Sequence, residues 1–192
     1  MKEKIKAVFF DLDGTLVNTL ASLKKTMDLT MEHFELEGVS LEETGLFVGT
    51  GYKKFVEKAL AKNADKKYRE AEKWEERDEE RAMDLDMEVD EIMGLYDEVC
   101  EYYASIFPKN STFQAEAYPG IKECIAALKE KGIAVVCITN KSKEVAEGVL
   151  SSVFPANSFS FIIGDDGEMP LKPDKAPLLK ACKELHIGVE EA

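Results

Sequence analysis

The chain has 192 residues, of which 45% are hydrophobic and 33% are charged. This composition is typical of a globular protein that can bury a sizeable core. Acidic residues outnumber basic ones by 38 to 25, and the net charge is −13. That balance argues against nucleic acid or an anionic membrane as the partner, because both require a basic surface. No apolar run approaches the roughly 20 residues of a membrane span.

The start of the chain and its cysteines indicate a cellular compartment. Residues 1–4 run directly into an apolar segment and lack the pattern of a signal peptide. Cys100, Cys124, Cys137 and Cys182 are scattered and form no C-x-x-C pair, which favours reduced thiols over a disulfide or metal framework. We therefore expect a cytoplasmic protein.

Short apolar runs predict three buried parallel strands at residues 5–10, 133–138 and 159–163. These runs are rich in Val, Ile and Phe, do not alternate with polar residues, and are bounded by polar residues or glycine. Helical patterns precede the second strand, at residues 121–128, and follow it, at residues 145–150. Because strands and helices alternate, we expect an α/β fold with a doubly wound, Rossmann-like parallel sheet.

The stretch between the first and second predicted strands is too long for a single crossover. From residue 17 to residue 112, apolar residues recur at three- and four-residue steps, which is typical of amphipathic helices. The simplest organisation is an α/β core of residues 1–16 and 113–192 with residues 17–112 inserted as an all-helical cap domain.

The segment Phe9–Leu16, at the end of the first predicted strand, carries the strongest chemical signal. It holds Asp11 and Asp13, one residue apart, followed by Gly14. Ligands of an open α/β sheet bind outside the carboxyl ends of its strands. Two adjacent carboxylates repel each other unless a cation joins them, which favours a divalent ion of the Mg²⁺ type. Gly14 permits a turn that can bring backbone N–H groups to an anion. The alternative is an acidic turn without chemistry.

This segment resembles the first motif of the haloacid dehalogenase superfamily, D-x-D-G-T. Two later segments resemble the second and third motifs in the same order. Residues 135–140 look like a strand that ends in Thr139, and Lys172 is followed by Pro173. The place of the helical insertion also matches the small helical cap of that superfamily. Each later motif is weak alone, so the resemblance depends on their order and spacing.

The resemblance implies an Mg²⁺-dependent phosphomonoester hydrolase with two catalytic aspartates. Asp11 would attack phosphorus and form an aspartyl-phosphate. Asp13 would protonate the leaving alkoxide and then take a proton from the attacking water. Superfamily dehalogenases usually lack this second acid, because a halide needs no proton, so Asp13 favours phosphate chemistry.

The resemblance also implies groups that bind the phosphoryl group. Thr139 would donate its hydroxyl to a phosphoryl oxygen, with help from the backbone N–H of Asn140 and from the turn at Gly14. Lys172 would neutralise charge on Asp11 and on the transferring phosphoryl group. Without the resemblance, Thr139 could equally be a strand-end cap and Lys172 a surface lysine.

The metal ligands implied by the resemblance are Asp11 and Asp13, with a third ligand from a fourth, acidic motif. The chain reaches Ala192 before that motif is expected. We therefore interpret the 192 residues as a fragment and expect it to be much less active than a longer parent. Asp165 and Asp166 precede the third motif, so we interpret them as loop residues rather than as the missing ligands.

Within the superfamily, the resemblance extends to bacterial phosphoglycolate phosphatases. Gly49, Thr50 and Gly51 stand where their cap loop usually reads G-N-G, which implies a loop that closes over the site and contacts the leaving group of the substrate. A plain turn before a helix is the alternative. The implied substrate is a small phosphorylated metabolite, with 2-phosphoglycolate leading. A pyrophosphatase, a sugar phosphomutase and an inert phosphate-binding relative remain open, and the sequence does not predict an oligomeric state.

Overall fold

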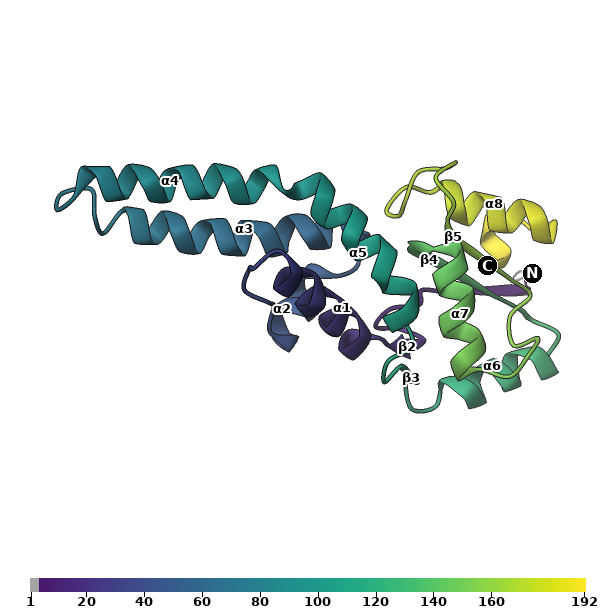
Figure 1. The fold of residues 1–192 in the computed structure, drawn as a ribbon. Coiled ribbons are helices and arrows are strands. Elements are labelled where there is room, and N and C mark those ends of the chain that lie inside the picture. Colours follow the sequence, from purple (N-terminus) through teal and green to yellow (C-terminus); the bar gives the residue numbers. More distant parts are fainter. Residues whose placement is uncertain (1–3) are drawn as a thin grey trace. The chain divides into compact units, whose positions relative to one another are not determined.

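The computed structural model describes residues 4–192 (Figure 1), so residues 1–3 of the expected core lie outside the described residues. The chain forms two compact units. The α/β unit contains the N-terminal residues through Ser22, residues 49–51 and residues 111–192. The helical unit contains residues 23–48 and 52–110. The loop at residues 49–51 therefore packs with the α/β unit, although it lies between two helical segments in the sequence.

The α/β unit is built on a parallel sheet whose strand order is β1, β4, β5. The strands are β1 (Ala7–Phe10), β4 (Ala134–Ser142) and β5 (Phe161–Asp165). Phe9 pairs with Val136, and Val136 pairs with Phe161 on the other side of β4. All three predicted strands are confirmed, because buried strands of a parallel sheet require continuous apolar runs.

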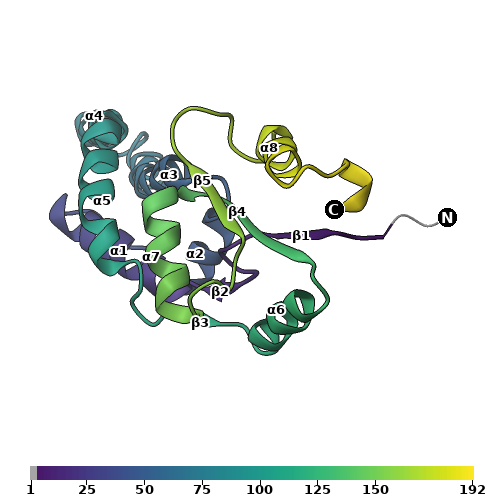
Figure 2. The ribbon, with the colours of Figure 1, turned by 90° about the vertical axis from the view of Figure 1, so that its right-hand side faces the viewer.

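Helices cover both faces of this sheet. They are α6 (Ile121–Glu130), α7 (Lys143–Val153) and α8 (Ala176–Leu185), followed by a 3-10 turn at Val189–Glu191. Figure 2 shows α6 and α7 on one side of the sheet and α8 on the other. Where α8 covers the sheet, its Ala181 packs with the buried side chains of Val136, Ile138 and Ile163 in one core cluster. The predicted doubly wound α/β core is confirmed.

A small antiparallel ribbon joins β2 (Val17–Asn18) to β3 (Glu116–Ala117). The expectation that the insertion is helical from residue 17 onward is therefore wrong at its start. Two-residue strands carry no periodic pattern, since a period needs several residues to show. The helix α1 (Leu20–His33) begins immediately after this ribbon.

The helical unit consists of most of α1 together with four further helices. These are α2 (Leu41–Phe47), α3 (Tyr52–Ala71), α4 (Glu79–Gly94) and α5 (Tyr96–Asn110). In Figure 1, α3 and α4 run side by side, and each buries the apolar face that the sequence pattern predicts, with Leu60 and Leu85 among the buried residues. Within the described residues 4–192, none of the helices combines the length and the apolar character that a membrane span needs.

Asn63 on α3 holds the segment that follows α1. Its side chain accepts a hydrogen bond from the Glu37 N–H (2.8 Å) and donates to the Glu37 carbonyl (3.0 Å) and the Ala59 carbonyl (3.0 Å). Because Asn63→Leu leaves the backbone groups of Glu37 without this partner, we expect the free energy of unfolding to fall by about 1–2 kcal/mol. Urea unfolding measures the change, with exposed Arg69→Leu on the same helix as the control, expected within about 0.5 kcal/mol of wild type. Equal stability of the two variants would contradict this role of Asn63.

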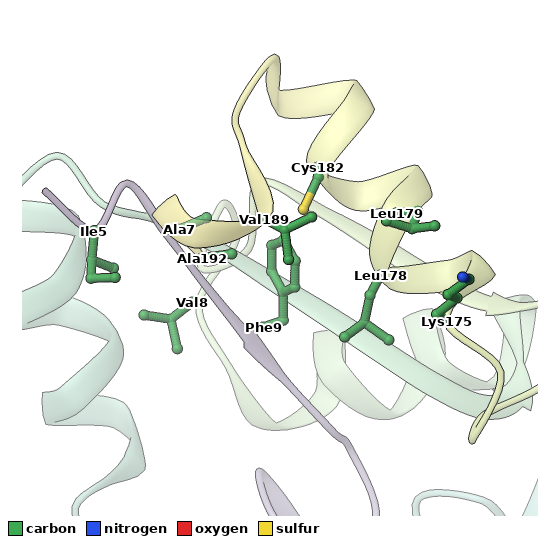
Figure 3. Close-up of a pocket in the computed structure, with 10 residues that line it drawn as sticks. All are labelled: Ile5, Ala7, Val8, Phe9, Lys175, Leu178, Leu179, Cys182, Val189 and Ala192. Carbon is green, nitrogen blue, oxygen red and sulfur yellow. The ribbon is translucent and has the colours of Figure 1, made fainter. Parts of the chain in front are cut away.

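An apolar groove of about 490 Å³ lies beside β1 (Figure 3). Its walls come from β1, from α8 and from the last residues of the chain, and Leu178, Leu179 and Val189 are exposed there. Its lining includes Lys175 but none of the candidate site residues from the sequence. The candidate site must therefore be sought elsewhere, at the carboxyl ends of the strands.

Candidate active site

The loop after β1 fixes the backbone that carries Asp11 and Asp13. The Leu12 carbonyl accepts a hydrogen bond from the Val17 N–H (3.1 Å), and the Gly14 N–H donates to the Val17 carbonyl (3.0 Å). Gly14 has φ +77°, a conformation that glycine adopts without strain. This N–H closes the loop itself, and a role of Gly14 in phosphate binding stays a prediction.

Lys172 lies directly against Asp11. Its ammonium is 2.7 Å from Asp11 Oδ1 and also donates to the Ile138 carbonyl (2.8 Å). The Asp11 side chain is 42% exposed and that of Lys172 is 24% exposed. Two residues that stand far apart in the sequence thus form an ion pair that a solute can reach, at the carboxyl end of β1.

Asn140 holds the backbone of Lys172 in place. Its Oδ1 accepts from the Lys172 N–H (2.8 Å), and its Nδ2 donates to the Lys172 carbonyl (2.9 Å). The neighbouring Thr139 is buried, and its Oγ1 accepts from the Lys141 N–H (3.2 Å). A hydroxyl that accepts one hydrogen bond keeps its own proton for donation. The sequence analysis assigns a role only to the backbone N–H of Asn140. The contacts of its side chain with the Lys172 backbone come from the structure alone.

The loop of Gly49, Thr50 and Gly51 also reaches these residues. The Gly49 carbonyl accepts a hydrogen bond from Asn140 Nδ2 (3.2 Å), and a Cβ at Gly51 would lie 3.5 Å from Leu171 Cδ1. Gly49 has φ +108° and Gly51 has φ +91°, so both positions favour glycine. Thr50 is exposed. Contact of this loop with a substrate stays a prediction.

Asp13 is held by two residues that the sequence analysis missed. The Thr19 hydroxyl donates to Asp13 Oδ1 (2.5 Å), and the Lys141 ammonium is 3.3 Å from the same oxygen. Burial lowers the pKa of Lys141 below its usual range, and the Asp13 carboxylate offsets part of this effect. Lys141 follows Thr139 by two residues in a strand, so a shared face was a usable signal. No spacing rule connects Thr19 to Asp13.

The loop after β1 offers oxygen donors of the kind that Mg²⁺ takes in proteins. Among residues 4–192, no group of three or more His, Cys, Asp or Glu side chains could hold a metal ion. Mg²⁺ is usually bound through one or two carboxylates, with waters and substrate phosphate as its other ligands. The Asp11 carboxylate and the Asp13 backbone carbonyl fit that donor set, while the Asp13 carboxylate is engaged by Thr19 and Lys141. Asp165 and Asp166 instead accept the Gly167 and Glu168 N–H groups (3.0 Å each), as loop residues do.

Cys137 lies on β4 beside the site, and its thiol is buried. Burial, reinforced by the Asp11 carboxylate, raises its pKa to about 12, so it stays protonated at pH 8. Cys124 is exposed, whereas Cys100 and Cys182 are buried. We expect iodoacetamide at pH 8 to modify Cys124 first in the folded protein, and Cys124→Ser to remove that fast phase. Early modification of Cys137, detected by peptide mass spectrometry, would contradict the burial of this thiol.

Comparison with known proteins shows which family the chain resembles. Residues 8–192 match the family model of the haloacid dehalogenase-like hydrolases. The phosphoglycolate phosphatase of Nitrosospira multiformis is 28% identical over 95% of this chain and 70% of its own length. Phosphoglycolate phosphatase 1 of Pseudomonas aeruginosa is 30% identical over 97% of this chain and 60% of its own length. A crystal structure from Lactobacillus delbrueckii subsp. bulgaricus, of a protein provisionally named phosphoglycolate phosphatase, has a TM-score of 0.78 at 25% identity and covers 96% of this chain and 75% of that one.

The family match spans nearly the whole chain and includes the Asp11, Thr139 and Lys172 segments. The resemblance that the order of the motifs predicts is thereby confirmed, as is the enzyme class, since the relatives reported above are named as phosphatases. The chain belongs to the haloacid dehalogenase-like hydrolases.

Proposed function

We propose that this protein hydrolyses small phosphomonoesters through an aspartyl-phosphate on Asp11. The observation that carries the proposal is the ion pair between Lys172 and Asp11 at the carboxyl end of β1, with Asp13 on the same loop. A carboxylate nucleophile needs a cation beside it, because two anions otherwise repel as the carboxylate approaches a phosphate. Lys172 supplies that charge while leaving Asp11 exposed.

Each remaining residue has a step in this reaction. An Asp11 oxygen forms a bond to phosphorus as the bond to the leaving oxygen breaks, and Asp13 gives that oxygen a proton. Asp13 then takes a proton from the water that attacks phosphorus, which releases phosphate and restores Asp11. Thr139 and the Asn140 N–H donate hydrogen bonds to phosphoryl oxygens throughout. The Asp11 carboxylate and the Asp13 backbone carbonyl would hold Mg²⁺, which would supply further neutralisation of phosphoryl charge.

The proposed substrate is 2-phosphoglycolate or a similar small phosphate. Support comes from the relatives, which are named phosphoglycolate phosphatases. A second support is the loop at residues 49–51, whose Gly49 carbonyl contacts Asn140 and so lies beside the proposed phosphoryl site. A cytoplasmic location is proposed as well, because small phosphorylated metabolites are found there.

Phosphate release by the full-length protein that carries this sequence tests the proposal. We expect release from 2-phosphoglycolate with Mg²⁺, and loss of release when a chelator is added. Pyrophosphate and sugar phosphates serve as competing substrates, and isomerised sugar phosphate without free phosphate would identify a mutase. Release from pyrophosphate alone, or no release from any ester, would overturn the proposal.

A further inference from the structure

Lys141 is a buried cation whose contact the proposed reaction has not yet used. Its side chain is 4% exposed, and its ammonium is 3.3 Å from Asp13 Oδ1. Burial of an ammonium group costs free energy unless a counter-charge and hydrogen bonds compensate for the lost water. The Asp13 carboxylate provides that counter-charge. A lysine placed there is therefore tied to Asp13 rather than to solvent.

The backbone around Lys141 is held by a hydrogen bond within β4 and by close packing against β5. The Lys141 N–H donates to Thr139 Oγ1 (3.2 Å), and the register of β4 with β5 shifts between Ile138 and Ser142. On β5, Gly164 lies so near that a Cβ would be 2.8 Å from the Lys141 carbonyl oxygen. This close approach fixes the end of β4 against β5.

The two lysines of the site have different surroundings. Lys172 contacts Asp11, and both side chains are open to a solute. Lys141 instead shares Asp13 Oδ1 with the Thr19 hydroxyl, which donates to the same oxygen. Since two donors occupy Oδ1, a proton carried by Asp13 belongs on Oδ2. The contacts of Asp13 therefore distinguish Oδ1, which accepts from two donors, from Oδ2, which can carry the proton.

We infer that Lys141 is a positioning residue for Asp13: with Thr19 it holds Oδ1, so that Oδ2 carries the proton and faces the leaving group. This inference rests on the proposed function. As the phosphorus–oxygen bond breaks, the Oδ2 proton moves to the leaving alkoxide, and Oδ2 later accepts a proton from the attacking water. Because the rotation of the carboxylate is fixed beforehand, no reorientation is needed when the proton moves.

The test compares two small substrates in the full-length protein. The leaving group of 2-phosphoglycolate is an alkoxide, which needs a proton. The leaving group of acetyl phosphate is acetate, which needs none. We expect Lys141→Met to lower kcat for 2-phosphoglycolate by about 10²-fold, since a misplaced group of this kind costs about that much. The expected loss for acetyl phosphate, measured as the initial phosphorylation of the enzyme, is at most about fivefold, because this step involves no proton transfer. Lys141→Arg, which keeps the charge, should recover part of the lost rate.

Two variants serve as controls. Lys172→Met should lower both rates alike, because Lys172 contacts the nucleophile rather than the acid. Exposed Lys143→Met, two residues along the chain from Lys141, should change neither rate.

A second variant tests the inference if Lys141→Met does not fold, as judged by circular dichroism. Thr19→Val removes the other donor to Asp13 Oδ1 without leaving a buried charge unpaired, and its loss of rate should depend on the leaving group in the same way.

The outcomes separate the inference from the function on which it rests. An equal loss on both substrates for Lys141→Met and for Thr19→Val, or no loss on either, would overturn the role of Lys141 and leave the phosphatase proposal standing. Absence of phosphate release from both substrates in the wild-type protein would overturn the proposed function itself.

Discussion

Asp11→Asn is expected to lower kcat for phosphate release from 2-phosphoglycolate by at least about 10⁴-fold, as removal of a catalytic nucleophile does. The amide is a poor nucleophile and also removes the charge that Lys172 neutralises. Steady-state kinetics with Mg²⁺ at saturating substrate measures the change. Circular dichroism should show an unaltered fold, because the Asp11 side chain is 42% exposed.

Asp165→Asn is the matched control for this experiment. Its side chain accepts the Gly167 N–H, a contact that an asparagine oxygen can also make, so we expect kcat to stay within about twofold of wild type. A large loss in Asp165→Asn would show that this loop contributes to catalysis or to metal binding. Retention of more than a tenth of the activity by Asp11→Asn would contradict Asp11 as the nucleophile.

Asp13→Asn is expected to lower kcat for 2-phosphoglycolate by about 10²- to 10⁴-fold, the range of general acid–base catalysis. Asparagine cannot supply a proton to the leaving alkoxide. Phosphorylation of the enzyme by acetyl phosphate should be far less affected, because acetate leaves without a proton. Rapid-quench kinetics separates this step from the release of phosphate, which needs Asp13 as a base with either substrate.

Asp166→Asn on the β5 loop is the control for Asp13→Asn, with an expected kcat near that of wild type. Asp13→Asn also removes the carboxylate beside Lys141, so we expect a lower free energy of unfolding in that variant. An equal loss of the phosphorylation rate with both substrates would argue that Asp13 acts through structure alone.

The parallel strands could be predicted because they are buried on both faces and so consist of continuous apolar runs. The helices of the insertion could be predicted because α3, α4 and α5 each bury one apolar face. The ribbon of β2 and β3 could not, since two-residue strands are fixed by pairing between distant segments. The end of α4 at Gly94 also has no signal in the sequence, because the helical spacing of apolar residues continues into α5.

The candidate site shows the same division between local and distant information. Asp11 and Asp13 could be predicted because both stand on one short loop after a strand. Lys172 could be connected with them only through a resemblance, because the fold alone brings it to Asp11. The contact between Lys141 and Asp13 joins two segments far apart in the sequence, so the spacing places Lys141 on the face of Thr139 but does not identify Asp13 as its partner. The side-chain contacts of Asn140 with Lys172 and Gly49 likewise join segments that lie far apart in the sequence.

Direct detection of a phosphorylated Asp11 tests the central claim. Asp13→Asn protein is mixed with acetyl phosphate and Mg²⁺, quenched in acid and reduced with borohydride, which converts an aspartyl-phosphate to homoserine. We predict homoserine at position 11 by peptide mass spectrometry, and none in the Asp11→Asn, Asp13→Asn double variant. The wild-type protein must be active for this test. If Asp13→Asn then yields no homoserine at position 11, or yields it at another residue, the aspartyl-phosphate mechanism is contradicted.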